Sequence, residues 1–159
     1  MEPDDPDYKY GVEDYDLIYP NVYHSAYHTA YNKDKLEELG ITHILSLGNE
    51  FEEEFKDSYT YKIFGLDDDD DNDVKQFFKE GIAFIEKCLQ DKGTILVHCA
   101  AGISRSGAMM TAYSMYRDKV TFEEALEYVQ SKRTKVFPNE GFRKQLQEFE
   151  EELKDLHVY

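Results

Sequence analysis

Residues 94–107 read TILVHCAAGISRSG and join an apolar run, a tight turn and the start of a helix. The run Thr94–His98 is continuously apolar between two turn signals, which is typical of a buried central strand. A turn containing Gly102 follows, and we expect a helix over residues 104–117. A strand that passes through a short loop into a helix is the basic unit of α/β domains. The sequence therefore predicts an α/β fold with a central sheet flanked by helices.

The loop after this strand has the composition of an oxyanion site. A tight turn that ends in a helix N-terminus points several backbone N–H groups into one small bowl, which suits phosphate. Arg105 lies six positions after Cys99, so its planar guanidinium can fold over that bowl and pair with phosphate oxygens. The expected phosphate-binding residues are Ala100, Ala101, Gly102, Ile103, Ser104 and Arg105.

Cys99 is the candidate nucleophile in this bowl. Positive potential from the loop N–H groups and Arg105 favours thiolate over thiol, and the thiolate is the reactive form of cysteine. Ser106 is close enough in sequence to donate a hydrogen bond to the sulfur when it leaves in a second step. A buried inert cysteine would not explain the Gly-Ser-Arg loop that follows it.

The rest of the chain fits one domain of strands and helices. Apolar alternation predicts strands over residues 21–24, 41–48 and 61–66. Apolar residues at helical spacing and capping signals predict helices over residues 32–39, 74–90, 121–132 and 139–153. Thr121 and Glu124 are spaced as a capping box. We expect residues 1–20, rich in Asp, Tyr and Pro, to form an N-terminal arm and residues 21–159 to form the catalytic domain.

Charge and composition narrow the functional class. The net charge is −16, of which residues 1–20 carry −6 and residues 50–73 carry −9. A chain this acidic lacks the basic face that nucleic-acid binding requires, and it favours partners with basic surfaces. No apolar run approaches the ~20 residues that span a membrane, and the first residues do not resemble a signal peptide. Two cysteines are too few for a disulfide scaffold, so we expect a cytoplasmic or nuclear protein.

Three motifs in order resemble a known family. His98, Cys99, Arg105 and Ser106 form the His-Cys-x5-Arg-Ser signature of cysteine-based protein tyrosine phosphatases. The fuller VHCAAGISRSG is similar to the small, atypical dual-specificity phosphatases, as are LGITHILSLG (residues 39–48) and FPNEGF (residues 137–142). The resemblance implies a mixed, mostly parallel sheet and hydrolysis of phosphotyrosine and phosphoserine or phosphothreonine through a cysteinyl-phosphate. It implies a phosphoprotein or phosphopeptide substrate, and neither a cofactor nor a metal.

The acidic stretch GLDDDDDND, residues 65–73, contains the expected general acid. Expulsion of the substrate oxygen needs a proton, which an aspartic acid on a nearby loop can supply. The family pattern places this acid at Asp68, with Asp67 and Asp69 as competitors one position away. A calcium-binding loop starting at Asp67 would need Gly and Glu where the chain has Asn72 and Phe78. We expect the remaining aspartates to form a solvated loop.

Several further residues have two interpretations. We expect His98 to order the phosphate loop, and Asn139 to cap the last helix while, as the resemblance implies, bracing that loop. Arg133 either belongs to a solvated helix end or, by resemblance, contacts a second phosphate or an acidic side chain of the substrate. Cys88 is best explained by core packing, with a redox partnership with Cys99 as the alternative.

Two other functions remain open at the level of the sequence. The first is a phosphopeptide-binding scaffold without turnover, although inactive relatives usually lack the Cys or the Arg that are present here as Cys99 and Arg105. The second is a phosphatase for non-protein phosphomonoesters such as lipids. Lipid-directed relatives tend to carry a basic loop, whereas Ala100, Ala101 and Ile103 are neutral.

Overall fold

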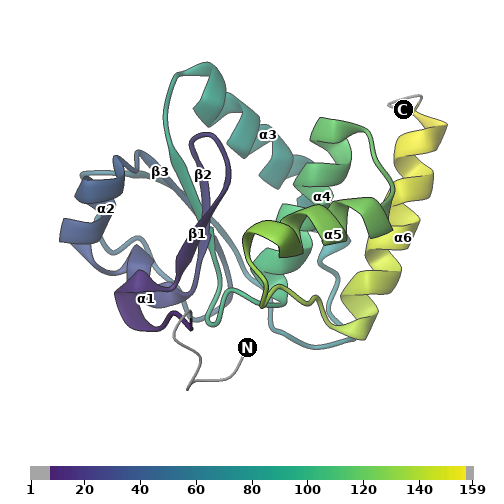
Figure 1. The fold of residues 1–159 in the computed structure, drawn as a ribbon, viewed down its shortest axis with the longest axis horizontal. Coiled ribbons are helices and arrows are strands. Elements are labelled where there is room, and N and C mark those ends of the chain that lie inside the picture. Colours follow the sequence, from purple (N-terminus) through teal and green to yellow (C-terminus); the bar gives the residue numbers. More distant parts are fainter. Residues whose placement is uncertain (1–7, 157–159) are drawn as a thin grey trace.

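A single sheet of five strands organises the computed structural model, which describes residues 8–156. The strands are β1 (Tyr15–Tyr19), β2 (Val22–Ser25), β3 (His43–Leu47), β4 (Thr60–Phe64) and β5 (Ile95–His98). Their order across the sheet is β1-β2-β5-β3-β4, and only β1 is antiparallel to its neighbour (Figure 1). The predicted mixed, mostly parallel sheet is confirmed.

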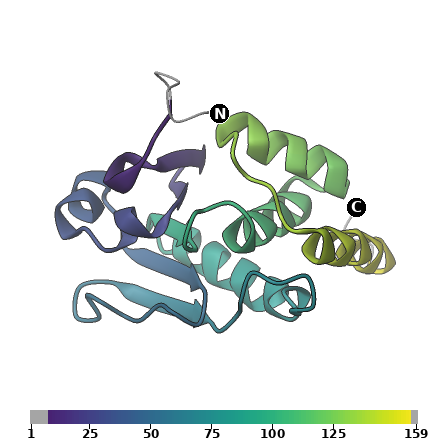
Figure 2. The same cartoon turned by 90° about the horizontal axis from the view of Figure 1, so that it is seen from below.

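Helices cover both faces of this sheet. Two short helices, α1 (Tyr27–Ala30) and α2 (Lys33–Leu39), lie on one face, and four longer helices lie on the other (Figure 2). The four are α3 (Phe78–Gln90), α4 (Arg105–Asp118), α5 (Phe122–Lys132) and α6 (Glu140–Asp155). Two short 3₁₀ helices, η1 (Gly11–Glu13) and η2 (Lys75–Phe77), precede β1 and α3. No helix within residues 8–156 is both long and apolar enough to cross a bilayer.

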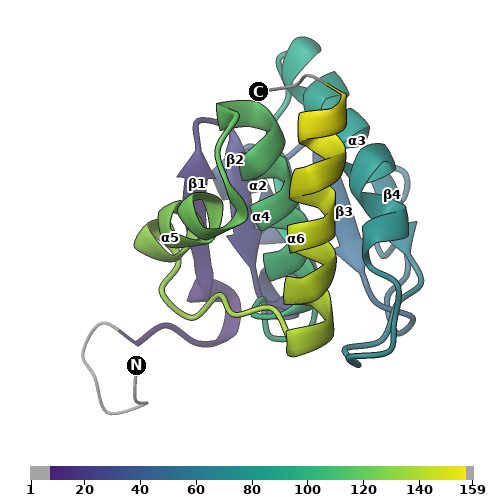
Figure 3. The ribbon, with the colours of Figure 1, turned by 90° about the vertical axis from the view of Figure 1, so that its right-hand side faces the viewer.

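The segment from β5 to α4 is the centre of the molecule. Every residue of β5 is buried, because β2 and β3 flank the strand and helices cover it. α4 is buried from Arg105 to Met115 and is surrounded by α3, α5 and α6 (Figure 3). The predicted buried central strand is confirmed. Because β5 and α4 are both packed into the core, the two ends of the loop between them are fixed in position.

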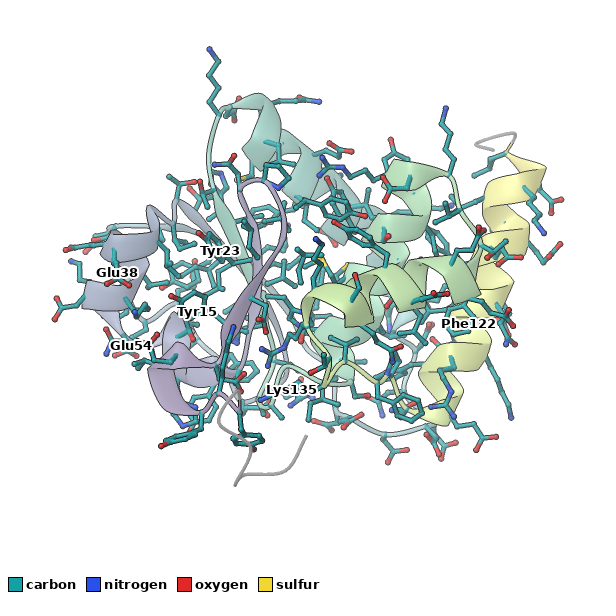
Figure 4. All side chains as sticks on the ribbon, in the orientation of Figure 1. Tyr15, Tyr23, Glu38, Glu54, Phe122 and Lys135 are labelled. Carbon is teal, nitrogen blue, oxygen red and sulfur yellow. The ribbon has the colours of Figure 1, made fainter. Side chains whose placement is uncertain are left out.

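The N-terminal prediction is wrong in its second half. Residues 15–19, expected within an arm, form the edge strand β1, which pairs with β2 through a tight turn at Asn21, whose φ is +66°. The rings of Tyr15 on β1 and Tyr23 on β2 pack edge to face, with their centroids 5.9 Å apart (Figure 4). β1 lies at the edge and is only partly buried, so its side chains do not alternate cleanly between apolar and polar. Residues 1–7 of the expected arm lie outside the described residues.

The parallel strands direct three loops to one edge of the sheet. β3, β4 and β5 run in the same direction, so the loops that follow them meet beyond their carboxyl ends. Open α/β sheets bind ligands at this edge. These loops contain the acidic residues after Leu47, the aspartate run after Phe64 and the phosphate-loop motif after His98.

Candidate active site

Cys99 forms the floor of the site. It follows β5 directly and is only 3% exposed, at the base of the loop that leads into α4. Its Sγ lies 3.0 Å from the hydroxyl oxygen of Ser106, the second residue of α4. The hydroxyl is therefore within hydrogen-bond reach of the sulfur.

The loop between β5 and α4 turns its carbonyl groups outward. Each carbonyl from residue 100 to residue 103 accepts a hydrogen bond from outside the loop. The bonds run from Tyr27 N to Ala100 O (3.0 Å), from Arg133 Nη2 to Ala101 O (3.1 Å), from Arg133 Nε to Gly102 O (2.9 Å) and from Phe137 N to Ile103 O (2.9 Å). Because these carbonyls point outward, the peptide N–H groups face the centre, which is the arrangement of an anion-binding nest.

Gly102 makes this turn possible. Its φ is +67°, in the left-handed region that glycine adopts without steric cost. An added Cβ would lie 2.5 Å from the carbonyl oxygen of Ser25 and equally close to Nη2 of Arg133. Both the backbone conformation and the space therefore require glycine at this position.

The Arg105 guanidinium lies within the site and is held by a carboxylate. It is 6% exposed, and its Nη1 and Nη2 donate to the two oxygens of Glu50 at 2.8 and 3.0 Å. Nη1 also donates to the carbonyl of Leu66 at 3.2 Å. The hydrogen bond from Arg105 lowers the pKa of Glu50, so the carboxylate stays charged. This two-point contact fixes the plane of the guanidinium.

His98 holds the base of the loop from below. Its Nε2 lies 2.7 Å from the hydroxyl of Ser46, and its Nδ1 lies 3.1 Å from the carbonyl oxygen of Cys99. Burial lowers the pKa of His98 to about 4, so the ring is neutral near pH 7. A neutral, doubly hydrogen-bonded ring suits the ordering role predicted for it and not that of a proton donor in catalysis.

Asn139 connects three parts of the site. Its side-chain oxygen accepts from Phe142 N at 2.8 Å and caps α6, as predicted. Its backbone N–H donates to the Ser104 hydroxyl at 2.9 Å, and its Nδ2 donates to Asp68 Oδ1 at 2.9 Å. Asn139 therefore ties the phosphate loop to the aspartate loop. Asp68 is also near enough to Arg105 for their charges to attract.

The other aspartates shape their own loop. Asp67 accepts from Asn49 Nδ2 at 3.0 Å, and Asp69 accepts from the backbone N–H of Asp71 at 2.9 Å. Asp70 accepts from the N–H of Gly141, at the start of α6, at 3.3 Å. These residues are exposed, as expected of a solvated loop, and they also make hydrogen bonds that give the loop its shape. Within residues 8–156, no group of His, Cys, Asp and Glu side chains is arranged to hold a metal ion.

The geometry contradicts both interpretations of Arg133, the solvated helix end and the contact with a substrate group. Its side chain is fully buried behind the loop, and Nη1 pairs with Asp14 at 2.8 Å and Asp16 at 3.0 Å. Its other donors are bound to the carbonyls of Ala101 and Gly102. Arg133 therefore braces the loop from inside, because the acidic residues on and before β1 draw it away from solvent.

Core packing of Cys88 is confirmed, and the redox partnership with Cys99 is wrong. Cys88 is fully buried, and its sulfur lies 3.9 Å from the hydroxyl of Thr42. Thr42 bonds to Thr94, just before β5, whereas Cys99 follows the opposite end of that strand. A disulfide needs Cα atoms roughly 4.4–6.8 Å apart, and a four-residue strand is longer than that.

Two contacts in the site involve residues that sequence reasoning missed. Glu50 pairs with Arg105, and His24 lies 2.6 Å from the Ser106 hydroxyl. An acidic residue just beyond the predicted strand 41–48 was a usable signal for Glu50, because that strand ends at the same sheet edge. Nothing local in the sequence around His24 indicates its partner, which is 82 positions away.

These features define a class of protein. A cysteine under a nest of N–H groups, with an arginine beside it at the carboxyl edge of a parallel sheet, is the site of the cysteine-based protein tyrosine phosphatases. Residues 22–152 match the family model described as the dual specificity phosphatase catalytic domain. The chain therefore belongs to the dual specificity phosphatase family, which consists of protein tyrosine/serine/threonine phosphatases.

Curated relatives agree with this assignment. Dual specificity protein phosphatase 1B of Arabidopsis thaliana is 34% identical over 144 residues, which cover 91% of this chain and 86% of the relative. MAP kinase phosphatase with leucine-rich repeats protein 1 of Dictyostelium discoideum is 38% identical over 138 residues. That match covers 87% of this chain but only 16% of the Dictyostelium protein. The chain thus corresponds to a small part of some relatives and to most of others.

Solved structures share the fold. The human tyrosine phosphatase-like serine/threonine/tyrosine-interacting protein is 32% identical with a TM-score of 0.82, over 91% of this chain and 98% of that one. A mouse putative dual specificity phosphatase, solved with zinc tungstate, is 26% identical with a TM-score of 0.85, over 91% of each chain.

Proposed function

We propose that this domain hydrolyses phosphomonoesters on tyrosine and on serine or threonine of protein substrates, with Cys99 as the nucleophile. The observation that carries the proposal is the position of the Cys99 sulfur, 3.0 Å from the Ser106 hydroxyl at the floor of a loop whose carbonyls point outward. The inward N–H groups and the Arg105 guanidinium supply the positive charge that a phosphoryl group in transfer requires.

The first step transfers the phosphoryl group to sulfur. The Cys99 thiolate attacks phosphorus, and the bond from phosphorus to the substrate oxygen breaks. Asp68 gives its proton to that oxygen, so the side chain leaves as a neutral phenol or alcohol. Asp68 is favoured over Asp67 and Asp69 because its carboxylate is the one bonded to Asn139, which also donates to the phosphate loop.

The second step releases phosphate. A water molecule attacks phosphorus, the Asp68 carboxylate takes a proton from that water, and the bond from phosphorus to sulfur breaks. The electron pair returns to Cys99, and the Ser106 hydroxyl stabilises the departing sulfur by its hydrogen bond. The products are inorganic phosphate and the free enzyme, so the cycle needs no further reactant.

The surroundings of the loop favour a peptide substrate. A hollow beside Ala100 is lined by Tyr27, Tyr31, Phe51 and the side chains of Glu50 and Glu52. Aromatic walls next to the phosphate site suit a phosphotyrosine ring and neighbouring side chains. The neutral loop residues Ala100, Ala101 and Ile103 give no basic surface for a phospholipid headgroup.

A phosphopeptide-binding scaffold is the second candidate function. The human tyrosine phosphatase-like serine/threonine/tyrosine-interacting protein, which shares this fold, bears the name of an interacting protein, and this similarity supports the candidate. Phosphate binding without turnover would use the same loop and Arg105 but not Asp68.

Hydrolysis assays separate these functions. We expect wild type to hydrolyse an aryl phosphate and phosphotyrosine and phosphothreonine peptides, and Cys99→Ser to have no activity. Asp68→Asn should lower kcat by roughly 10²- to 10⁴-fold, the usual contribution of general acid catalysis. Asp71→Asn, a matched change in the same loop, should retain nearly full activity. A phosphate adduct on the Cys99 peptide, detected by mass spectrometry after acid quenching, would report the intermediate.

Two results would contradict the mechanism. Full activity of Cys99→Ser would exclude the cysteine as nucleophile. Phosphopeptide binding by wild type without any hydrolysis would favour the scaffold.

A further inference from the structure

A buried histidine lies behind the Ser106 hydroxyl. His24, on β2, is fully buried and faces the same side of the sheet as Val22, toward the core beneath α4. Its Nε2 lies 2.6 Å from Ser106 Oγ, which itself lies 3.0 Å from Cys99 Sγ. The three side chains form a chain of contacts that ends at the candidate nucleophile.

The other ring nitrogen of His24 is unpartnered. Nδ1 is the one buried side-chain nitrogen or oxygen in residues 8–156 without a hydrogen-bond partner. Burial lowers the pKa of His24 well below its ordinary value, and the positive charge of Arg133 lowers it further. A protonated imidazole is therefore disfavoured at this position. The ring is neutral and carries one proton.

The position of that proton follows from the contacts. A proton on Nδ1 would be a buried donor with no acceptor, which is the costly kind of unsatisfied group. A proton on Nε2 can be donated to Ser106 Oγ, and Nδ1 then has only an unused lone pair, which costs less. The second tautomer satisfies the contacts better.

This tautomer determines the direction of the serine proton. A hydroxyl has one hydrogen, and its oxygen can accept while that hydrogen is donated elsewhere. When Ser106 Oγ accepts from His24, its own hydrogen is free to point to the Cys99 sulfur. In the opposite tautomer, Ser106 would donate to His24 and would present a lone pair to the thiolate.

We propose that His24 is a positioning residue for phosphoryl transfer, whose Nε2–H holds the Ser106 hydroxyl with its proton directed at Cys99. The inference rests on the proposed function and extends it to a residue that does not touch the substrate. A donor fixed in advance stabilises the thiolate in the free enzyme and again when sulfur leaves phosphorus. His24 therefore acts on both steps through Ser106.

The tautomer can be tested in the wild-type protein without any substitution. We expect the ¹⁵N NMR spectrum of the folded protein to show His24 protonated at Nε2 and bare at Nδ1 near pH 7. The signal that disappears in His28→Gln belongs to the exposed His28, so this variant helps to assign the remaining histidine signals. A spectrum with the proton on Nδ1 would overturn the proposal.

Substitutions test the consequence for Cys99. The readout is the midpoint pH of Cys99 alkylation by iodoacetamide, which reports the thiolate. We expect His24→Leu to raise this midpoint by about one pH unit, since a lost hydrogen bond to the charged form shifts its titration by that order. His24→Gln, whose side-chain N–H can reach the same hydroxyl, should return the midpoint toward wild type.

A double substitution separates positioning from packing. In a Ser106→Ala background, His24→Leu should produce no further change in the midpoint, because the hydroxyl that it orients is gone. An unchanged midpoint in folded His24→Leu, or an equal shift in both backgrounds, would refute the role. Where His24→Leu does not fold, the wild-type tautomer still decides the question. Because neither readout needs turnover, an inactive wild type would refute the proposed function without deciding the role of His24.

Discussion

The two sides of the phosphate loop are built in opposite ways. On the inner side, the side chains are almost completely buried and contact one another at hydrogen-bond distance. They are Arg133, Asp14, His24 and Ser106. On the outer side, the loops at residues 50–57 and 67–73 consist mainly of exposed acidic residues. The inner side holds the loop in shape, and the outer side sets the charge that an approaching substrate meets.

This difference separates two kinds of energy. A buried charge that loses its partner cannot recover the lost interaction from water, so each inner contact has a large effect. Exposed charges are screened by salt and solvated in any conformation, so each has a small effect. Inner substitutions should therefore change stability and the catalytic steps, and outer substitutions should mainly change rates of encounter.

The largest effect is expected for Arg133→Met. The change removes the buried guanidinium from Asp14 and Asp16, which keep only Lys135 and Lys9 as partners, and it removes both donors from the loop carbonyls. We expect the free energy of unfolding to fall by roughly 3–5 kcal/mol, as for other broken buried pairs. Urea denaturation at pH 7 would measure it. Lys132→Met, at the exposed neighbouring position, should change it by less than about 0.5 kcal/mol. A loss below 1 kcal/mol for Arg133→Met would remove the contrast between the two sides.

The next largest effect is a pH dependence of stability that arises from two buried histidines, His24 and His98. The pKa values of His24 and His98 are lowered by burial, that of His98 to about 4. Below about pH 6.5 the unfolded chain takes up protons at these histidines and the folded chain does not. Stability therefore falls as the pH falls from 7 to 5, by up to about 1.4 kcal/mol per histidine per pH unit.

Substitution isolates the contribution of one histidine. His24→Gln should reduce the slope of unfolding free energy against pH in this window by about one proton equivalent. His28→Gln, the same substitution at an exposed position, is the matched control. Equal slopes in wild type and His24→Gln would show that His24 titrates similarly in both states.

Glu50 is the outer residue that reaches the loop, and its effect should be intermediate. Glu50→Gln removes the charge that orients the Arg105 guanidinium but leaves the site otherwise intact. We expect kcat/KM to fall roughly fivefold, because a partly exposed pair contributes about 1 kcal/mol. Steady-state kinetics on an aryl phosphate would measure this, with Glu53→Gln in the same loop as the control. A fall in kcat/KM of more than a thousandfold would show that the effect of Glu50 is as large as that expected for the buried inner residues.

The smallest effect concerns the residues next to the phosphorylated side chain. The segment of residues 50–73 carries a net charge of −9, so basic flanks should speed the encounter and acidic flanks slow it. We expect a difference of roughly threefold to tenfold in kcat/KM between Arg-flanked and Glu-flanked phosphopeptides at low salt, which 0.5 M salt should largely remove. A preference that persists in high salt would instead indicate direct side-chain contacts.

The same contrast explains what the sequence could predict. The phosphate loop, Cys99 and Arg105 lie within seven consecutive residues, so their pattern contains the geometry. Thr121 and Glu124 form the predicted capping box, because capping also depends on near neighbours. The apolar run before Cys99 revealed a buried central strand for the same reason.

Contacts between distant residues were not predictable in this way. Arg133 meets Asp14 across 119 positions, and a basic residue after a helix gives no sign that it turns inward. The strand β1 was missed because an edge strand lacks clean alternation. The sequence left Asp67, Asp68 and Asp69 as candidates for the general acid, and the contact of Asp68 with Asn139, 71 positions away, could not be read from it.

The buried ion pair between Arg133 and Asp14 has a consequence for folding during synthesis. Asp14 leaves the ribosome early and Arg133 late, and the loop that begins at Cys99 emerges between them. The growing chain thus contains every residue of the phosphate loop well before it contains the side chain that holds two of the loop carbonyls. A nascent chain that ends between these points lacks the brace, however complete its loop. The phosphate loop can therefore take its final shape only after Arg133 has been synthesised, when most of the domain is already present.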